Sequence, residues 1–230
     1  MKLIEGKDIE LLDELYFRNG NTGGARPKVN INIDDDLWIV KFRTRYDPKN
    51  IGKMEYDYFQ CAEKCGIRVP EYRLIKTDNN EYFASKRFDK NKLVLTSAAI
   101  LETDYRSPSL DYNSLIKLTD IISNSDKEEV MMMFRLMCFN VFAHNADDHA
   151  KNFSYIYNEH KDKWELSPAY DLTFSNTYYG EHTTSVDGNG YNPGREDILR
   201  VAKKNNLKNV DGIVDEIKEI VEENLIEYLS

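Results

Sequence analysis

The 230-residue chain lacks an excess of basic residues, a long apolar run and an apolar leader. Lys and Arg number 31 against 40 Asp and Glu, which gives a net charge of −9. Because attraction to phosphates dominates nucleic-acid affinity, this balance argues against a broad nucleic-acid-binding face, and we expect no direct nucleic-acid partner. No run approaches the roughly 18 apolar residues that span a bilayer. The start, "MKLIEGKDIE", has no apolar signal-peptide region. These absences predict a soluble protein without membrane contact.

Cysteines are also few. The chain has three, an odd number that gives no disulfide framework and favours a reducing cytoplasm. Cys61 and Cys65 lie four positions apart on a predicted helix and could form half of a metal site. No second ligand pair follows at zinc spacing, so we predict that both are buried helix cysteines.

The first third of the chain has the patterns of strands and one helix. Residues 28–33 ("KVNINI") alternate apolar and polar, and 37–43 ("LWIVKFR") form a second strand, so that "DDD" between them makes a solvated hairpin turn. Residues 52–67 ("GKMEYDYFQCAEKCGI") have helical spacing that ends at Gly66. A second strand pair, "PEYRLIKT" and "EYFASKRFDK", follows around the turn "DNN".

From about residue 96 helical patterns dominate. One helix is predicted at 111–123, and Ser125 with Glu128 forms a capping box for a buried helix that runs to about Phe142. A short hairpin, "FSYIY" and "KWELS", comes next, and two amphipathic helices at 195–207 and 210–229 end the chain. The pattern therefore predicts an α+β protein, with a sheet-rich lobe at 1–95 and a helical lobe at 96–230.

A polar stretch directly follows the buried helix. In "HNADDHAKN" (144–152), Asp147 and Asn152 have the D-x-x-x-x-N spacing of a kinase catalytic loop, in which the aspartate orients the acceptor hydroxyl and the asparagine holds Mg²⁺. The hairpin that follows returns the chain and places Asp171 of "SPAYDL" beside Asn152. Asp148 is the alternative base, but the five-residue offset to Asn152 selects Asp147. His160 and His182 fall in polar turns, and we predict no role for them.

The amino-terminal third offers the other parts of a phosphate site. Lys41 lies in "LWIVKF" among Trp38, Val40 and Phe42, so it either faces inward or lies on the wet face of an edge strand. Glu55, early on the next helix, could pair with Lys41. The Gly-rich turn "NTGGARPK" opens onto a strand, and its N–H groups could approach phosphates.

In order and spacing these residues resemble the HipA-type serine/threonine kinases of bacterial toxin–antitoxin systems, from about residue 18 to the end. The matching segments are "GGARPK", "VKF", "MEYDYFQCAEKCGI", "KRFDK", "HNADDHAKNFSY" and "SPAYDL". The resemblance implies a two-lobed protein-kinase-like fold and a site that uses ATP and Mg²⁺. The implied catalytic residue is Asp147, and the implied metal ligands are Asn152 and Asp171. The implied ATP-binding residues are Gly23, Gly24, Ala25, Arg26, Lys28, Lys41, Lys86, Arg87, Phe88, Asp89, His149, Lys151 and Tyr170.

Two departures from the family pattern bear on regulation and partners. The Gly-rich loop begins near residue 20, so we expect a kinase core without the family's amino-terminal domain, similar to the split HipT-like kinases, in which a small HipS-like protein supplies the missing part. We also expect a helix-turn-helix antitoxin as partner. Relatives often carry a loop serine whose phosphorylation ejects the loop, where this chain has Asn21. Thr22, one position along, is expected to hydrogen-bond the turn instead.

The resemblance thus predicts a cytoplasmic protein kinase that phosphorylates Ser or Thr of a translation component such as an aminoacyl-tRNA synthetase. One alternative is a small-molecule phosphotransferase of the same fold. The other is a catalytically silent module that binds an antitoxin, although the complete set of Lys41, Asp147, Asn152 and Asp171 argues against silence.

Overall fold

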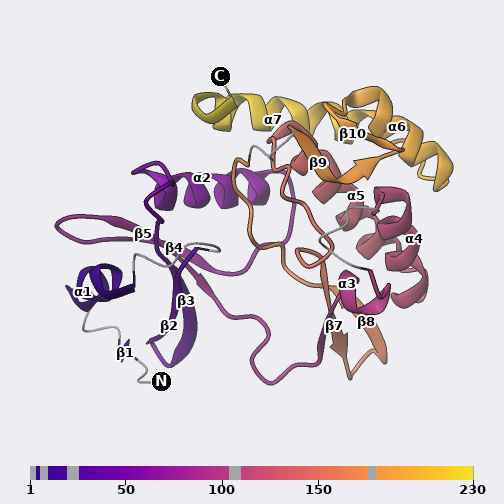
Figure 1. Cartoon of the computed structure of the whole chain (residues 1–230). Coiled ribbons are helices and arrows are strands. Elements are labelled where there is room, and N and C mark those ends of the chain that lie inside the picture. The colour runs from indigo at the N-terminus through magenta and orange to yellow at the C-terminus, as the bar shows by residue number, and fades with distance from the viewer. Residues whose placement is uncertain (1–3, 6–9, 20–25, 104–109, 176–179, 230) are drawn as a thin grey trace.

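The computed structural model describes residues 4–5, 10–19, 26–103, 110–175 and 180–229 (Figure 1). The predicted loop residues Asn21, Thr22, Gly23, Gly24 and Ala25 lie outside these ranges. Among the residues described, no helix combines the length and the apolar character that a membrane span needs.

The amino-terminal part is built on a five-stranded sheet in the order β1-β2-β3-β5-β4. Only β1 runs parallel to its neighbour, and the predicted hairpins β2–β3 and β4–β5 are both present. Asp34 and Asp35 link β2 to β3 with positive φ angles of 52° and 68°, as a tight hairpin turn requires. The elements are β1 (Ile4–Glu5), α1 (Glu10–Asn19), β2 (Lys28–Ile33), β3 (Asp36–Lys41), α2 (Ile51–Lys64), β4 (Tyr72–Lys76) and β5 (Glu81–Lys86).

Strand β5, which lies between β3 and β4, contributes to a hydrophobic core on each face of this sheet. Tyr82 and Ala84 pack with Leu12 of α1 in one core. Phe83, which points the other way, packs with Phe59 of α2 at a ring distance of 4.5 Å in the second core. Alternation of side chains along a strand therefore places α1 and α2 on opposite faces of the sheet.

The same alternation corrects one detail of the sequence interpretation. Trp38, Val40 and Phe42 are buried in the core that α1 covers. Of the two alternatives for Lys41, the inward-facing one is present, with 13% of its side chain exposed, but Lys41 points to the opposite face, toward α2. It therefore does not lie among those three apolar side chains.

The carboxy-terminal part consists of helices and two small sheets, one with the order β6-β7-β8 and one formed by β9 and β10 (Figure 1). Helix α5 is buried along most of its length, as predicted, and packs against α4 and α7. The elements are β6 (Val94–Thr96), α3 (Ser97–Ile100), α4 (Tyr112–Ile122), α5 (Lys127–Phe142), β7 (Ser154–Asn158), β8 (Lys163–Leu166), β9 (Glu181–Val186), β10 (Asn189–Tyr191), α6 (Arg195–Lys204) and α7 (Asp211–Leu229).

The predicted capping box at the start of α5 is wrong. Asn124 and Ser125 both have positive φ and turn the chain out of α4. The carboxylate of Asp126 is the group that accepts a hydrogen bond from the N–H of Glu128, at 2.9 Å. Asp126 is therefore the N-cap, one residue later than predicted.

Helix α2 joins the two parts of the molecule. Tyr58 is fully buried, its ring meets Phe139 of α5 edge to face, and its hydroxyl donates to the carbonyl of Ala143 at 2.7 Å. Cys61 and Cys65 are buried and free, as predicted, and Gly66 ends the helix with a φ of 71°. One continuous core thus extends from β5 through α2 to α5 and α7. The division of the chain at residue 95 remains a prediction.

Candidate active site

The loop after α5 holds Asp147 between two hydrogen bonds. Its N–H donates to Oγ of Ser175 at 2.7 Å, and its carbonyl accepts from Nδ2 of Asn152, also at 2.7 Å. The five-residue spacing therefore closes a small loop, in which the asparagine side chain reaches back to the aspartate backbone. Since Nδ2 of Asn152 is engaged in this way, Oδ1 is the amide atom left to face a cation.

Lys41 connects the two halves of the site. Its Nζ lies 2.9 Å from Oε2 of Glu55 on α2 and 2.5 Å from Oδ1 of Asp171. The predicted pairing of Lys41 with Glu55 is therefore present. Burial by itself would lower the pKa of Lys41, but the two carboxylates outweigh burial and raise that pKa. Lys41 consequently stays charged throughout the neutral range.

Arg26 extends this chain of charges to the segment before β2. Its Nη1 lies 2.5 Å from Oε1 of Glu55, and its Nε lies 3.2 Å from Oδ1 of Asp47. Glu55 is only 2% exposed and is neutralised from both sides, by Arg26 and by Lys41. A buried carboxylate needs such partners, because an unpaired one costs several kcal/mol.

Two adjoining cavities lie between the sheet and the loop of Asp147, and they share Lys28, Lys41, Tyr170 and Asp171. The first, of about 420 Å³, is the more apolar, with Ile39, Phe59 and Val94 in its wall. The second, of about 550 Å³, contains Asp147. Of the predicted site residues, the first cavity is also lined by Lys86, Arg87, Phe88 and Asp89, and the second by Arg26, His149, Lys151 and Asn152.

Residues 86–89, which the resemblance implied as ATP-binding, differ in how they face the first cavity. Asp89 forms a two-point ion pair with Arg87, and this hydrogen bonding lowers the pKa of Asp89. Phe88 packs against Tyr170 at a ring distance of 5.7 Å. The ammonium group of Lys86 is turned instead toward Asp36, 2.5 Å away. Lys86 therefore borders the cavity while its charge is directed to the edge of the sheet.

Tyr170 and Asp171 come from the segment that follows β8. The hydroxyl of Tyr170 contacts Oγ of Ser154 and donates to the carbonyl of Lys151, both at 2.5 Å, and burial raises its pKa to about 12. Asp171 adopts a positive φ of 54°, which turns its carboxylate into the site. The charge of Lys41 lowers the pKa of Asp171.

Asp147 is shifted in the opposite direction. Burial is the main cause that raises its pKa, and the charges of Asp148 and Asp171 add to the effect, whereas His149 and Arg26 oppose it. The pKa of Asp147 is thus raised while that of Asp171 is lowered. Opposite shifts of two carboxylates in one site are typical of paired acid–base groups.

Several residues at the site were not predicted from the sequence. Thr44, Asp47, Thr173 and Ser175 line the cavity that contains Asp147. The prediction that His182 lies in a polar turn is wrong. His182 lies in β9, with its side chain 7% exposed and its Nδ1 3.0 Å from Asp148. The β-branched run in "EHTTSV" is the signal that would have identified this strand. His160 lies in the turn between β7 and β8, as predicted.

Comparison with protein families decides the relationship. Residues 20–225 match the family model described as the HipA-like C-terminal domain. This chain belongs to that family. The resemblance to HipA-type kinases that the sequence motifs indicated is therefore confirmed.

Individual relatives of this HipA-like domain are distant. The curated protein named "Putative kinase Y4dM" from Sinorhizobium fredii is 25% identical over 193 residues, which cover 74% of this chain and 45% of Y4dM. The chain thus spans about half the length of that relative.

Two solved structures share the fold. The HipA chain in the Shewanella oneidensis complex of HipA, HipB and operator DNA matches 96% of this chain and 63% of its own length, with a TM-score of 0.71 and 14% identity. The Helicobacter pylori proinflammatory kinase CtkA matches 90% of this chain and 92% of its own, with a TM-score of 0.57 and 15% identity. The predicted two-lobed kinase-like α+β fold is therefore confirmed.

Proposed function

We propose that this HipA-like domain is a serine/threonine protein kinase that uses ATP and Mg²⁺. The observation that carries the proposal is the position of Lys41, whose ammonium group joins Glu55 of α2 to Asp171 at the border of the two cavities. In kinases, the corresponding lysine–glutamate pair and metal-binding aspartate must both be in place for transfer.

The roles we propose follow from the lining of the two cavities. The more apolar cavity, bordered by Ile39 and by residues 86–89, would take the adenine. Lys28 and Lys41 border both cavities and would meet the phosphates. Asp147 would accept the proton of the acceptor hydroxyl, whose oxygen attacks the γ-phosphorus while the bond to the β-phosphate oxygen breaks and ADP leaves.

The donor set is suited to Mg²⁺. The described residues contain no cluster of three or more His, Cys, Asp or Glu side chains able to hold a metal, so a structural metal site of that kind is not present among them. Asp171 and Asn152 line one cavity and would supply two oxygen ligands. Mg²⁺ is typically held by one or two carboxylates together with substrate phosphates. When bound, the ion would neutralise charge on the phosphates.

The family also suggests where the protein acts. The fold match to HipA in a complex with HipB and operator DNA supports a toxin–antitoxin context. We propose a cytoplasmic toxin, restrained by a helix-turn-helix antitoxin and accompanied by a small HipS-like protein. Its substrate would be a protein of translation, such as an aminoacyl-tRNA synthetase.

The test combines nucleotide binding with transfer. ATP with Mg²⁺ should raise the Tm of the wild type, since a ligand at 100 times its Kd stabilises the folded state by about 2.7 kcal/mol. Asp171→Ala should lose most of the Mg²⁺-dependent rise. Asp147→Asn should keep the ATP-dependent rise but lose transfer of labelled phosphate to host proteins.

Each competing function predicts a different result. Labelled phosphate on small molecules alone would indicate a small-molecule phosphotransferase. A wild type that neither binds ATP nor transfers phosphate, yet binds the antitoxin, would indicate a silent binding module. Full transfer by Asp147→Asn would overturn the proposed role of Asp147.

A further inference from the structure

Strand β9 holds the loop of Asp147 from both sides of that residue. The N–H and the hydroxyl of Thr183 donate to the carbonyl of Ala146, at 2.9 and 3.1 Å. The hydroxyl of Thr184 donates to the carbonyl of Asp148. The carbonyl groups of the residues on either side of Asp147 are therefore fixed by a strand that comes more than thirty residues later in the chain.

The side chain of Asp148 adds a buried anchor. It is 1% exposed and receives hydrogen bonds from the hydroxyl of Tyr112 at 2.7 Å and from the N–H of Thr184 at 2.9 Å. Nδ1 of His182 lies 3.0 Å from Oδ2, the carboxylate oxygen that also accepts from Tyr112. A carboxylate buried this deeply is tolerated only with such partners, so the three contacts define one position for Asp148.

This anchor belongs to a longer polar network in the interior. Tyr112 accepts a hydrogen bond from Nδ2 of Asn140 at 2.9 Å, and Asn140 in turn accepts one from Nδ2 of Asn145 at 3.0 Å. The network joins α4, α5, β9 and the beginning of the loop. Hydrogen bonds in a buried network restrict the motion of its members, and among the buried side-chain atoms of this network only Oδ1 of Asn145 has no partner within the described residues.

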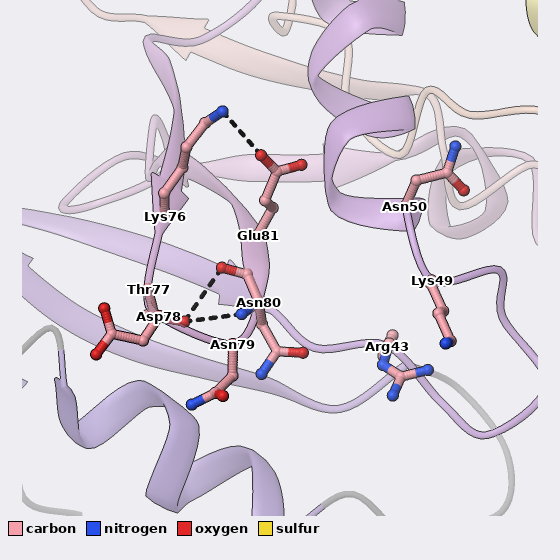
Figure 2. A pocket seen from close by; sticks show the side chains of 9 residues that line it. All are labelled: Arg43, Lys49, Asn50, Lys76, Thr77, Asp78, Asn79, Asn80 and Glu81. Carbon is pink, nitrogen blue, oxygen red and sulfur yellow. Dashed lines mark hydrogen bonds and ion pairs between the residues drawn. The ribbon is translucent and has the colours of Figure 1, made fainter.

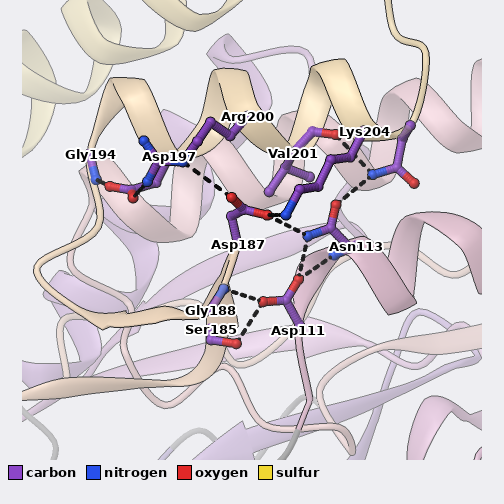
Figure 3. Close-up of polar contacts among 11 residues, drawn as sticks. Asp111, Asn113, Ser185, Asp187, Gly188, Gly194, Asp197, Arg200, Val201 and Lys204 are labelled. Atoms are coloured by element: carbon purple, nitrogen blue, oxygen red, sulfur yellow. Dashed lines mark hydrogen bonds and ion pairs between the residues drawn. The ribbon is translucent and has the colours of Figure 1, made fainter.

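The far end of β9 is itself fixed (Figure 3). Asp111, the N-cap of α4, accepts hydrogen bonds from the hydroxyl of Ser185 and the N–H of Gly188, both at 2.7 Å. In the turn that follows, Asp187 pairs with Arg200 and Lys204 of α6. The hairpin of β9 and β10 is thus braced against two helices, and it can act as a rigid support for the loop.

We infer that Asp148 and His182 are positioning residues. They act as a pair to hold the carboxylate of Asp147 where the acceptor hydroxyl would bind. The inference rests on the proposed phosphotransfer function and adds two residues to it. Asp148 itself borders neither cavity, in contrast to Asp147. Its effect on the reaction must therefore pass through the backbone that the two aspartates share.

The test replaces each partner and measures kcat and the KM for ATP. His182→Phe keeps a ring but removes the Nδ1 contact. Asp148→Asn replaces one carboxylate oxygen by an N–H₂ group, which cannot accept the hydrogen bond that this oxygen receives in the wild type. Because displacement of a catalytic group by about 1 Å can cost about 100-fold in rate, we expect kcat to fall at least about 10-fold. The KM for ATP should stay within about twofold, since the ATP-binding residues are untouched.

Conservative rescue separates positioning from general stability. His182→Asn keeps a hydrogen-bonding nitrogen near the place of Nδ1 and should recover most of the lost kcat. If the two residues act as a pair, Asp148→Asn combined with His182→Phe should cost less than the product of the single effects. All rates are referred to the number of ATP-binding sites, so a partly unfolded preparation does not lower them.

A matched carboxylate serves as control. Asp13 of α1 also accepts hydrogen bonds from a tyrosine and from neutral groups, at Thr77, Asn79, Asn80 and Tyr82. Thr77, Asn79 and Asn80 line the hollow drawn in Figure 2, at the turn between β4 and β5. Asp13→Asn should lower the Tm without changing kcat, since Asp13 borders neither cavity of the site.

The outcomes separate this inference from the proposed function. Wild-type rates in both His182→Phe and Asp148→Asn, with an active wild type, would overturn the inference alone. A folded wild type without phosphotransfer would overturn both. If Asp148→Asn does not fold, His182→Phe and Thr183→Val, which removes one hydrogen bond to Ala146, carry the test, and unchanged kcat in both would reject the positioning role.

Discussion

At the scale of single residues, the proposed role of Asp147 as proton acceptor predicts a loss of activity at low pH. Burial raises this pKa above the ordinary aspartate value of about 3.9. The ionised form, which would accept the proton in the proposed reaction, is therefore lost at a higher pH than for an exposed aspartate. We expect kcat/KM to fall on the acid side at a higher pH than an ordinary aspartate would give, measured under conditions where the fold is intact. An acid limb at or below the ordinary aspartate value would contradict this assignment.

Lys41 is the residue whose loss should be most costly. Lys41→Met keeps the length of the side chain but removes the charge between Glu55 and Asp171. We expect kcat/KM for ATP to fall about 100-fold or more, since fixed charges at a transferring group contribute effects of that size. Lys53→Met is the control, because Lys53 pairs with Asp57 on the outer side of α2. A similar loss in both variants would show that the effect does not come from the site.

The sequence was informative about residues that act within a few positions of one another and less so about distant partners. The spacing of Asp147 and Asn152 was visible because one side chain reaches the backbone of the other. The contact of Asp148 with His182 spans 34 positions. His182 was predicted to lie in a polar turn and was therefore given no role. Even with the strand recognised from "EHTTSV", nothing local shows that its histidine contacts Asp148.

At the scale of elements, Gly52 allows α2 to approach the sheet closely. A Cβ atom at this position would lie 2.3 Å from the carbonyl oxygen of Glu81 on β5, closer than atoms in contact can be. Gly52→Ala must push the helix away from the strand, and with it Glu55, one turn further along. We expect a loss of about 1–3 kcal/mol in the free energy of unfolding, as for other overpacked sites, and a higher KM for ATP.

Gly212 of α7 provides the matched control. Nothing lies within 4 Å of a Cβ atom at that position, so Gly212→Ala should be neutral or stabilise the protein by up to about 1 kcal/mol. Urea denaturation of both variants measures the difference. Equal stabilities would mean that α2 can move away from β5 at no cost.

The elements themselves were largely predictable, because strand alternation and helical periodicity are local. Both hairpins of the five-stranded sheet and the helices α2, α4, α5, α6 and α7 were expected from such patterns. The cap of α5 was misplaced by one residue, since positive φ at Asn124 and Ser125 extends the turn after α4. The face on which Lys41 lies depended on which helix covers which side of the sheet, and that is a property of the tertiary fold.

At the scale of the whole molecule, the two lobes should unfold together. Trp38 lies in the core covered by α1, whereas Trp164 packs at the edge of the other core. Because β5 contributes side chains to both cores, loss of either one disrupts the same strand. Trp38→Phe and Trp164→Phe each leave one tryptophan as the fluorescent reporter. After correction for the stability change that each substitution causes, we expect both variants to show the same dependence of the free energy of unfolding on urea concentration. Separate transitions in the wild type, by fluorescence and by circular dichroism, would contradict a single cooperative unit.

The burial of Tyr58 has a consequence for drug design. In protein kinases, the position of the helix that carries the paired glutamate controls activity. Here that helix is held by a buried ring, a hydrogen bond to Ala143 and contacts with α7. An outward swing would open the interior of the molecule to water, so we expect no additional ligand space to form behind α2. Selective inhibitors of this protein should therefore be sought among molecules that compete directly for the cleft bordered by Ile39, Val94 and Tyr170.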